Sequence, residues 1–175
     1  MPQIDTDLLP SCPTQLAEII SNAKIPGLAD EPVCHEAASM ISQLAEEYRG
    51  TLIESGLWLL FGELDRSHDI SQNIGSAEGS FWHGIMHRRE GDFGNSKYWF
   101  RRVGEGHPVH QALAAKIADS NLDADFESFG LDSSDTIAFG LVDACQTAIS
   151  RKKGLIPDLE QICWWEWQML LEHCF

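Results

Sequence analysis

Apolar residues recur every three or four positions along this chain, and no stretch alternates apolar and polar residues for long enough to predict a sheet. One strong stripe follows Glu31-Pro32, where proline suits the first helical turn because its missing N–H would have no partner there. The apolar members of that stripe are Ala37, Met40, Ile41, Leu44 and Ala45. The spacing predicts an all-α fold, an irregular helical bundle of antiparallel helix hairpins.

Short connections join the expected helices, which makes sequential helices antiparallel neighbours. The helices are expected over residues 14–24, 32–49, 52–61, 65–74, 78–90, 95–103, 108–120, 136–151 and 157–175. With 175 residues and 43% apolar content, the chain fits one helical domain with a real core. Residues 1–12 hold two prolines and no apolar period, so we expect a poorly ordered lead-in there.

The charge balance excludes several classes of partner. A formal net charge of -15 argues against nucleic acid and against anionic membranes, because both attract basic surfaces. No apolar run reaches the roughly 18 residues that a membrane span needs. The five cysteines form no C-x-x-C pair and are odd in number, which favours reduced thiols. The N-terminus lacks a basic signal region, and we expect a cytoplasmic protein.

Residues 81–102 break this acidic pattern. The segment carries a local charge of +3 and six of the 16 aromatic residues. Its cations are Arg88, Arg89, Lys97, Arg101 and Arg102. Grouped together, they would bind an acidic peptide or a small anion through charge-assisted contacts. The alternative is that these cations pair with local carboxylates and that the aromatic rings are core.

Two segments within residues 48–104 are alike at an offset of 29 positions. Each has a small residue, then a glycine followed by an acidic and an apolar residue, then a second small residue. The first segment has Ser55, Gly62-Glu63-Leu64 and Ser67, and the second has Gly84, Gly91-Asp92-Phe93 and Ser96. Glycine permits a tight left-handed turn, and small residues let two helices approach. The pattern predicts two helical hairpins.

These hairpins resemble those of the tetratricopeptide family, through Gly84, Gly91, Asp92, Phe93, Ser96 and Phe100. The resemblance implies a groove lined in the second unit by Phe81, Ile85, Arg88 and Arg89, with an acidic peptide or a C-terminal carboxylate as ligand. The offset of 29 departs from the roughly 34 residues of that family. Two ordinary hairpins in an irregular bundle are the alternative.

Three residues of the same segment suggest a different chemistry. His83, His87 and Glu90 follow an i, i+4, i+7 spacing, which places them on one stripe of a helix. Two imidazoles one turn apart can bind one divalent transition metal such as zinc. A third ligand is expected from His68, Asp65 or Glu63 on the neighbouring hairpin. Histidines that bond backbone carbonyls are the alternative.

The C-terminal segment is apolar in nearly every helical direction. Between residues 163 and 171 only Glu166 and Gln168 are polar. Such a helix is either central to the fold or buries one face against a second copy of the chain. The second case predicts a homodimer formed through Trp164–Leu171.

Three functions therefore stay open at this level. The first is a binding or scaffold protein without enzymatic activity or cofactor, which uses the basic hairpin and Phe81 to hold a peptide or anion. The second is a metal-dependent helical-bundle enzyme with Glu90 or Glu63 as base. The third is a homodimeric interaction protein. A P-loop, a G-x-S-x-G elbow and a G-x-G-x-x-G loop are all missing from the sequence.

Overall fold

The computed structural model describes residues 5–21, 23–24, 26–29, 35–44, 46–122, 126–151 and 153–175. Within these ranges the fold is all-α, with no strand, as the helical spacing predicted. The helices are α1 (Thr14–Ser21), α2 (His35–Ser42), α3 (Leu52–Leu60), α4 (Leu64–Ser71), α5 (Ala77–Glu90), α6 (Phe93–Val103), α7 (Pro108–Ala118), α8 (Ile137–Ser150) and α9 (Ile156–His173). Short 3-10 turns are Thr6–Leu8, Glu46–Tyr48, Glu127–Phe129 and Lys153–Leu155.

The helix expected over residues 32–49 is shorter than predicted. α2 ends at Ser42, whose hydroxyl donates to the Ser39 carbonyl and competes with the helical ladder. Gly50 has a left-handed φ of 70° and follows the 3-10 turn Glu46–Tyr48. The predicted start at Glu31-Pro32, the side chain of Ala37 and residue Ala45 lie outside the described residues.

The two predicted hairpins are present and built alike. Gly62 and Gly91 both have left-handed φ angles, 81° and 89°. The acidic residue after each glycine donates its N–H to a carbonyl five residues back, at 3.0 Å for Glu63 and 2.9 Å for Asp92. The Ser96 hydroxyl donates to the Gly84 carbonyl at 2.7 Å. At the equivalent positions of the first hairpin, the Ser55 hydroxyl donates in the opposite direction, to the Ser67 carbonyl at 3.0 Å. The same pair of positions is thus in contact in both hairpins, at the offset of 29.

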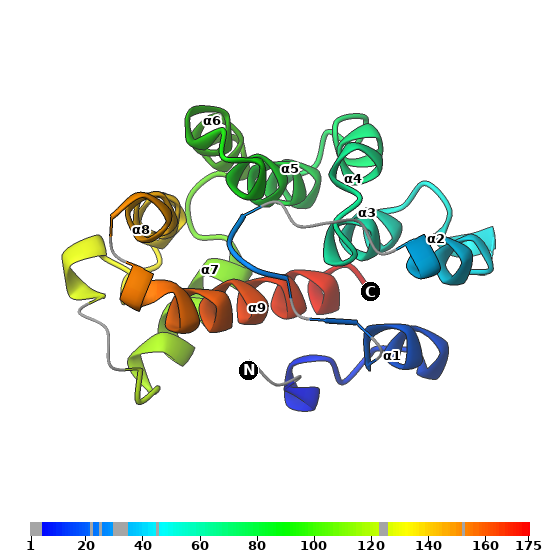
Figure 1. Ribbon diagram of the computed structural model, residues 1–175, viewed down its shortest axis with the longest axis horizontal. Coiled ribbons are helices and arrows are strands. Elements are labelled where there is room, and N and C mark those ends of the chain that lie inside the picture. The colour runs from blue at the N-terminus through cyan, green and yellow to red at the C-terminus, as the bar shows by residue number, and fades with distance from the viewer. Residues whose placement is uncertain are drawn as a thin grey trace.

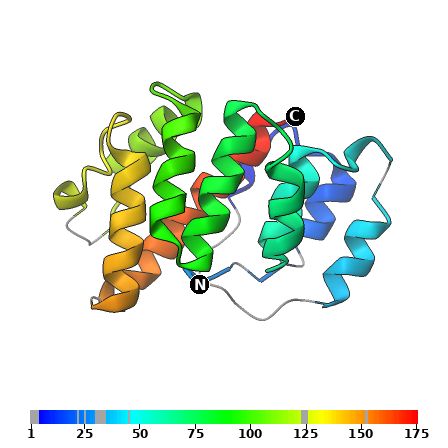
Figure 2. The same ribbon diagram turned by 90° about the horizontal axis from the view of Figure 1, so that it is seen from above.

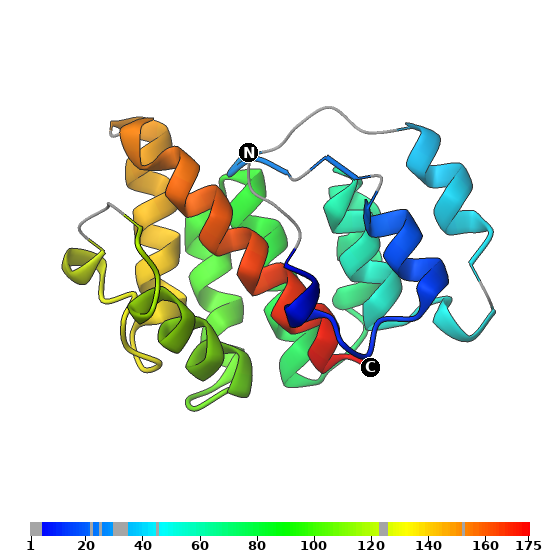
Figure 3. The same ribbon diagram turned by 90° about the horizontal axis from the view of Figure 1, so that it is seen from below.

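The helices form a layer that α9 crosses. Figure 2 shows α8, α6 and α5 side by side, with α4 and α3 beyond them. In Figure 3 α9 runs obliquely across one face of this layer, and Figure 1 shows α7 beside it. The contacts of α9 therefore reach from α3 to α8.

The core consists of two apolar clusters, and α9 contributes to both. Trp164, Trp167 and Leu170 belong to the cluster around α3 and α5. Leu159 and Ile162 belong to the cluster around α7 and α8. Since Trp164 and Trp167 are 2% and 3% exposed, the helix is central to the fold. Of the tryptophans in the predicted dimer segment, Trp164 and Trp167 are interior and Trp165 is partly buried, and the homodimer stays a prediction.

The first described residues are held against the bundle instead of forming the loose lead-in that was expected. The amide side chain of Gln168 donates to the Asp5 carbonyl at 2.7 Å, and Lys116 forms an ion pair with the Asp5 carboxylate at 2.8 Å. The Ser11 N–H donates to Glu172 at 3.1 Å. α9 and α7 therefore fix residues 5–12.

Candidate metal centre

Three histidine side chains from the two hairpins meet at one point. His68 comes from α4, and His83 and His87 come from α5. Their ring centroids are 4.5 Å (His68–His83), 4.9 Å (His83–His87) and 5.8 Å (His68–His87) apart. One ring nitrogen from each lies within 4.8 Å of the others. His68 therefore lies beside the predicted pair of His83 and His87.

Local sequence explains this meeting. The i, i+4 spacing puts His83 and His87 on one face of α5, and α4 packs directly against α5. Ser76 caps α5 by accepting the Gly79 N–H at 3.2 Å, which fixes where the helix begins. On the α6 side, the indole of Trp99 stacks on the His83 ring at a centroid distance of 3.8 Å. His83 is thus held between α4 and α6.

Glu90 supports the cluster from behind. Its carboxylate lies 3.0 Å from Nδ1 of His87. With the proton on Nδ1 shared with the carboxylate, the other nitrogen of His87 carries the lone pair that a metal uses. Carboxylates commonly hold metal-binding imidazoles in this way. Glu90 was predicted among the metal ligands, and its position is that of a residue that orients a ligand.

His83 is the most buried member of the cluster. It is 2% exposed, and its Nδ1 has no hydrogen-bond partner within the described part of the chain. Burial lowers the pKa of His83 to about 3, and the nearby His68 and His87 add to the shift. The ring is therefore neutral near pH 7 and presents a lone pair. A buried ring nitrogen without a partner costs free energy that a bound cation would offset.

The spacing suits a small transition metal after a modest closure. Zinc–imidazole bonds of roughly 2.0–2.1 Å place tetrahedral ligand atoms roughly 3.3 Å apart. Nitrogens within 4.8 Å of one another reach that spacing if each moves inward by at most about 1 Å. The carboxylate of Glu63, the other expected ligand or base, lies 3.7 Å from the Arg66 guanidinium, and Glu63 occupies the N-cap position of α4 without a capping hydrogen bond from its side chain. Asp65 is exposed on α4.

Two of the four arginines predicted to bind an external anion are interior, and the other two, Arg101 and Arg102, are exposed. Arg88 is 2% exposed and forms a bidentate ion pair with Glu166 of α9, with Nη1 to Oε1 at 3.2 Å. Arg89 is 6% exposed and donates to the Leu59 carbonyl. Trp167 of α9 donates to the Gly56 carbonyl at 2.9 Å. Helix α9 thus occupies the face on which a peptide was expected, and its Glu166 supplies the carboxylate.

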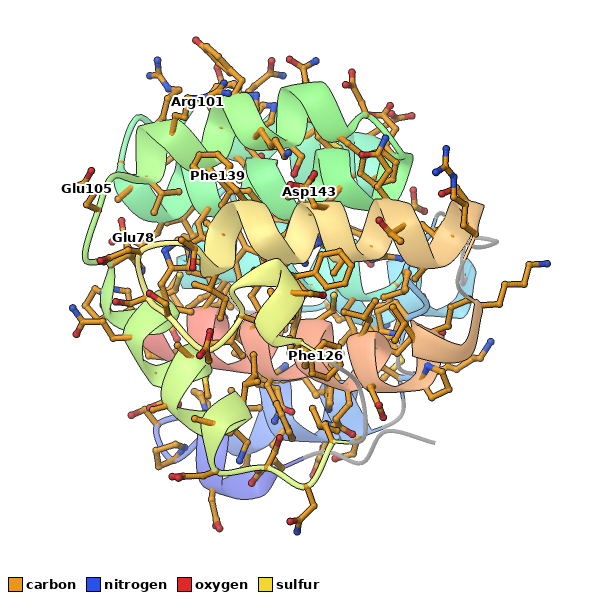
Figure 4. All side chains as sticks on the ribbon, turned by 90° about the vertical axis from the view of Figure 1, so that its left-hand side faces the viewer. Glu78, Arg101, Glu105, Phe126, Phe139 and Asp143 are labelled. Atoms are coloured by element: carbon orange, nitrogen blue, oxygen red, sulfur yellow. The ribbon has the colours of Figure 1, made fainter. Side chains whose placement is uncertain are left out.

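The remaining predicted site residues do not gather into a pocket. Lys97 pairs with Asp143 at 2.5 Å. Arg101 lies over the Phe139 ring at 5.6 Å, and Figure 4 shows this contact where α6 meets α8. Arg102 lies over Trp99 at 5.1 Å. Phe81 is fully buried against Phe100, His107 and His110, so it belongs to the core and not to a binding groove.

A second group of possible ligands has unsuitable chemistry. The Nε2 atoms of His107 and His173 lie 3.6 Å and 3.5 Å from Glu78. However, Nδ1 of His107 accepts the Val109 N–H at 3.3 Å. The neutral ring must then carry its proton on Nε2, which points to the carboxylate and has no lone pair for a metal. No sequence pattern predicted this group, because its members come from three distant segments.

Comparison with protein-family models, curated proteins and solved structures finds no match to this chain. The tetratricopeptide resemblance therefore stays a prediction. No helix within the described ranges is both long and apolar enough to cross a membrane.

Proposed function

We propose that this chain binds one divalent transition metal, with Zn²⁺ as the best fit, through His68, His83 and His87. The observation that carries the proposal is the meeting of three imidazoles from two hairpins, with Glu90 bonded to one of them. Nitrogen ligands suit zinc, copper and nickel better than magnesium or calcium. Three neutral nitrogens leave a tetrahedral zinc ion one open position.

The open position decides what the centre can do. His68 is half-buried and Glu90 is exposed, so this side of the cluster faces solvent. Zinc held by three imidazoles lowers the pKa of a bound water to about 7. A metal-bound hydroxide of this kind attacks activated esters and other carbonyl groups. Metal binding is the first function, and hydrolysis is the reaction that the donor set favours.

Titration of EDTA-treated protein with Zn²⁺ at about pH 7.5, where imidazoles are neutral, tests the proposal. We expect one equivalent of bound zinc. His68→Ala removes the half-buried ligand and should abolish this binding, while Glu90→Gln should weaken it roughly 10- to 100-fold. His173→Ala is the matched control, because this partly exposed histidine lies outside the cluster.

Two results would contradict the proposal. One is the absence of any bound zinc in the unmodified chain. The other is a zinc affinity that His68→Ala leaves unchanged. Hydrolysis of p-nitrophenyl acetate, compared between the wild-type chain with one equivalent of zinc and the same chain without zinc, then tests the reaction separately. A rate that does not depend on the bound metal identifies a structural centre.

A further inference from the structure

Two thiols outside the metal centre lie close together between α8 and α9. Sγ of Cys145 and Sγ of Cys163 are 3.8 Å apart. Cys145 is fully buried on α8, whereas Cys163 on α9 is partly exposed. Their sulfurs need to approach by roughly 1.8 Å to reach the length of a disulfide bond, about 2.05 Å. A single side-chain rotation on packed helices covers such a distance.

The surroundings make the two thiols unequal. The hydrogen bond from Cys145, together with the charge of Arg88, lowers the pKa of Cys163, although burial opposes this. The same hydrogen bond and burial raise the pKa of Cys145 well above its usual range. Cys163 is therefore the more acidic thiol of the pair. An accessible thiolate next to a second thiol is the arrangement of an oxidation-sensitive pair.

A small reagent can reach this sulfur. Cys163 lines a cavity of about 20 Å³, together with Leu59, Ile85, Arg88 and Trp164. The volume fits roughly one water-sized molecule, so peroxide is a closer match than a bulky disulfide such as oxidised glutathione. The positive charge of Arg88 also faces the negative charge that develops on a peroxide oxygen as it leaves.

We propose that Cys163 and Cys145 form a peroxide-responsive pair that closes into a reversible disulfide between α9 and α8. The Cys163 thiolate attacks one oxygen of hydrogen peroxide, the O–O bond breaks, hydroxide leaves, and Cys163 becomes a sulfenic acid. The Cys145 sulfur then displaces the sulfenic hydroxyl. The thiol proton leaves with it as water. Each peroxide molecule is reduced by two electrons while two thiols become one disulfide.

The disulfide would pin the helix that covers the hairpins. α9 carries Glu166, which pairs with Arg88 only one turn away from Cys163. A covalent link to α8 closes a loop of 18 residues and restricts the unfolded chain. The oxidised protein should therefore unfold at a higher temperature, with a rise of several degrees that dithiothreitol reverses.

Treatment of the EDTA-washed wild-type chain with hydrogen peroxide, followed by peptide mass mapping, tests the proposal. We expect a loss of about 2 Da and a cross-linked peptide joining Cys145 to Cys163. In Cys145→Ser, dimedone should trap a sulfenic acid at Cys163. In Cys163→Ser, it should give no adduct at Cys145. Cys12→Ser is the matched control and should form the cross-link as the wild type does.

The wild-type mapping needs no variant to fold, so it decides the matter on its own. Intact thiols at both positions, when peroxide has already modified Cys12 or Cys174, would overturn the proposal. So would a dimedone adduct on Cys145 in the wild type. The metal centre plays no part in this reaction, and either proposal stands if the other fails.

Discussion

Two buried histidines, His83 and His110, illustrate how differently the fold treats the same side chain. Both are less than 4% exposed, and each has a ring nitrogen without a hydrogen-bond partner among the described residues. His83 faces two other imidazoles, so a cation can satisfy its nitrogen. His110 packs against the Phe81 ring at 4.6 Å and has one imidazole beside it, that of His107 at 5.8 Å. Its burial therefore costs stability whenever protons are abundant.

Acidification should expose this cost. Burial, with further contributions from His107 and Arg88, lowers the pKa of His110 to about 4, whereas an unfolded histidine has a pKa of about 6.5. The unfolded chain thus binds the proton more tightly. The stability that neutral His110 contributes is complete above about pH 6.5 and is lost as the pH falls toward about 4.

We therefore expect His110→Leu to be less sensitive to acid than the wild type. The loss of unfolding free energy between about pH 7 and pH 4.5 should be smaller in the variant by about 2 kcal/mol. Urea unfolding at both pH values measures it. Equal losses in the two proteins would show that His110 is not held neutral by burial.

At the scale of elements, α9 covers the face of the two hairpins on which the sequence predicted a bound peptide. Gly56 of α3 and Arg88 of α5 lie on the face that α9 covers. Trp167 of α9 donates to the Gly56 carbonyl, and Glu166 of α9 pairs with Arg88. Both members of the Arg88–Glu166 pair are at most 2% exposed. A buried ion pair is costly to break, because the partner that remains keeps its charge without compensation.

Removal of one partner should therefore cost more than removal of both. Glu166→Leu alone is expected to lower the free energy of unfolding by about 3–5 kcal/mol. The double variant Arg88→Met/Glu166→Leu should regain most of that free energy of unfolding, because no unpaired charge remains.

Urea denaturation of the four proteins of this cycle measures the coupling. The surface pair Glu46–Arg49, in which both side chains are more than half exposed, is the control and should contribute less than about 1 kcal/mol. A double variant as unstable as Glu166→Leu would show that the helix is anchored by packing alone.

Local causes made much of this fold predictable. The helices expected from apolar spacing matched the bounds of α3, α5 and α6 within two residues, and the glycine turns followed from one residue each. The pairing of His83 with His87 was predictable because it lies within one helix. The ion pair of Arg88 was not predictable, since its partner Glu166 is 78 positions away. Neither was the Cys145–Cys163 contact, which depends on how α8 and α9 cross.

At the scale of the whole molecule, one helix completes two apolar clusters. α9 contributes Trp164 and Leu170 to one cluster and Ile162 to the other. Trp164 and Trp167 therefore stabilise the single chain, and only Trp165 is partly exposed.

The chain should accordingly be monomeric. Sedimentation equilibrium over a wide dilution series is expected to give a mass of 19.5 kDa at every concentration. A mass near twice that value would instead indicate a dimer. If substitution of an exposed residue such as Tyr98 returned the mass to that of the monomer, the dimer contact would lie on α6. Such a contact would leave the interior position of α9 unchanged.

The position of α9 also sets an order of events during translation. The ribosome makes α3–α6 before it makes α9. Until α9 has been made, Gly56 and Arg88 of the nascent hairpins are not covered by it. Domains that lack a closing segment expose apolar surface to chaperones and to other nascent chains. A chain that ends before residue 156 would therefore keep this face uncovered and be prone to association.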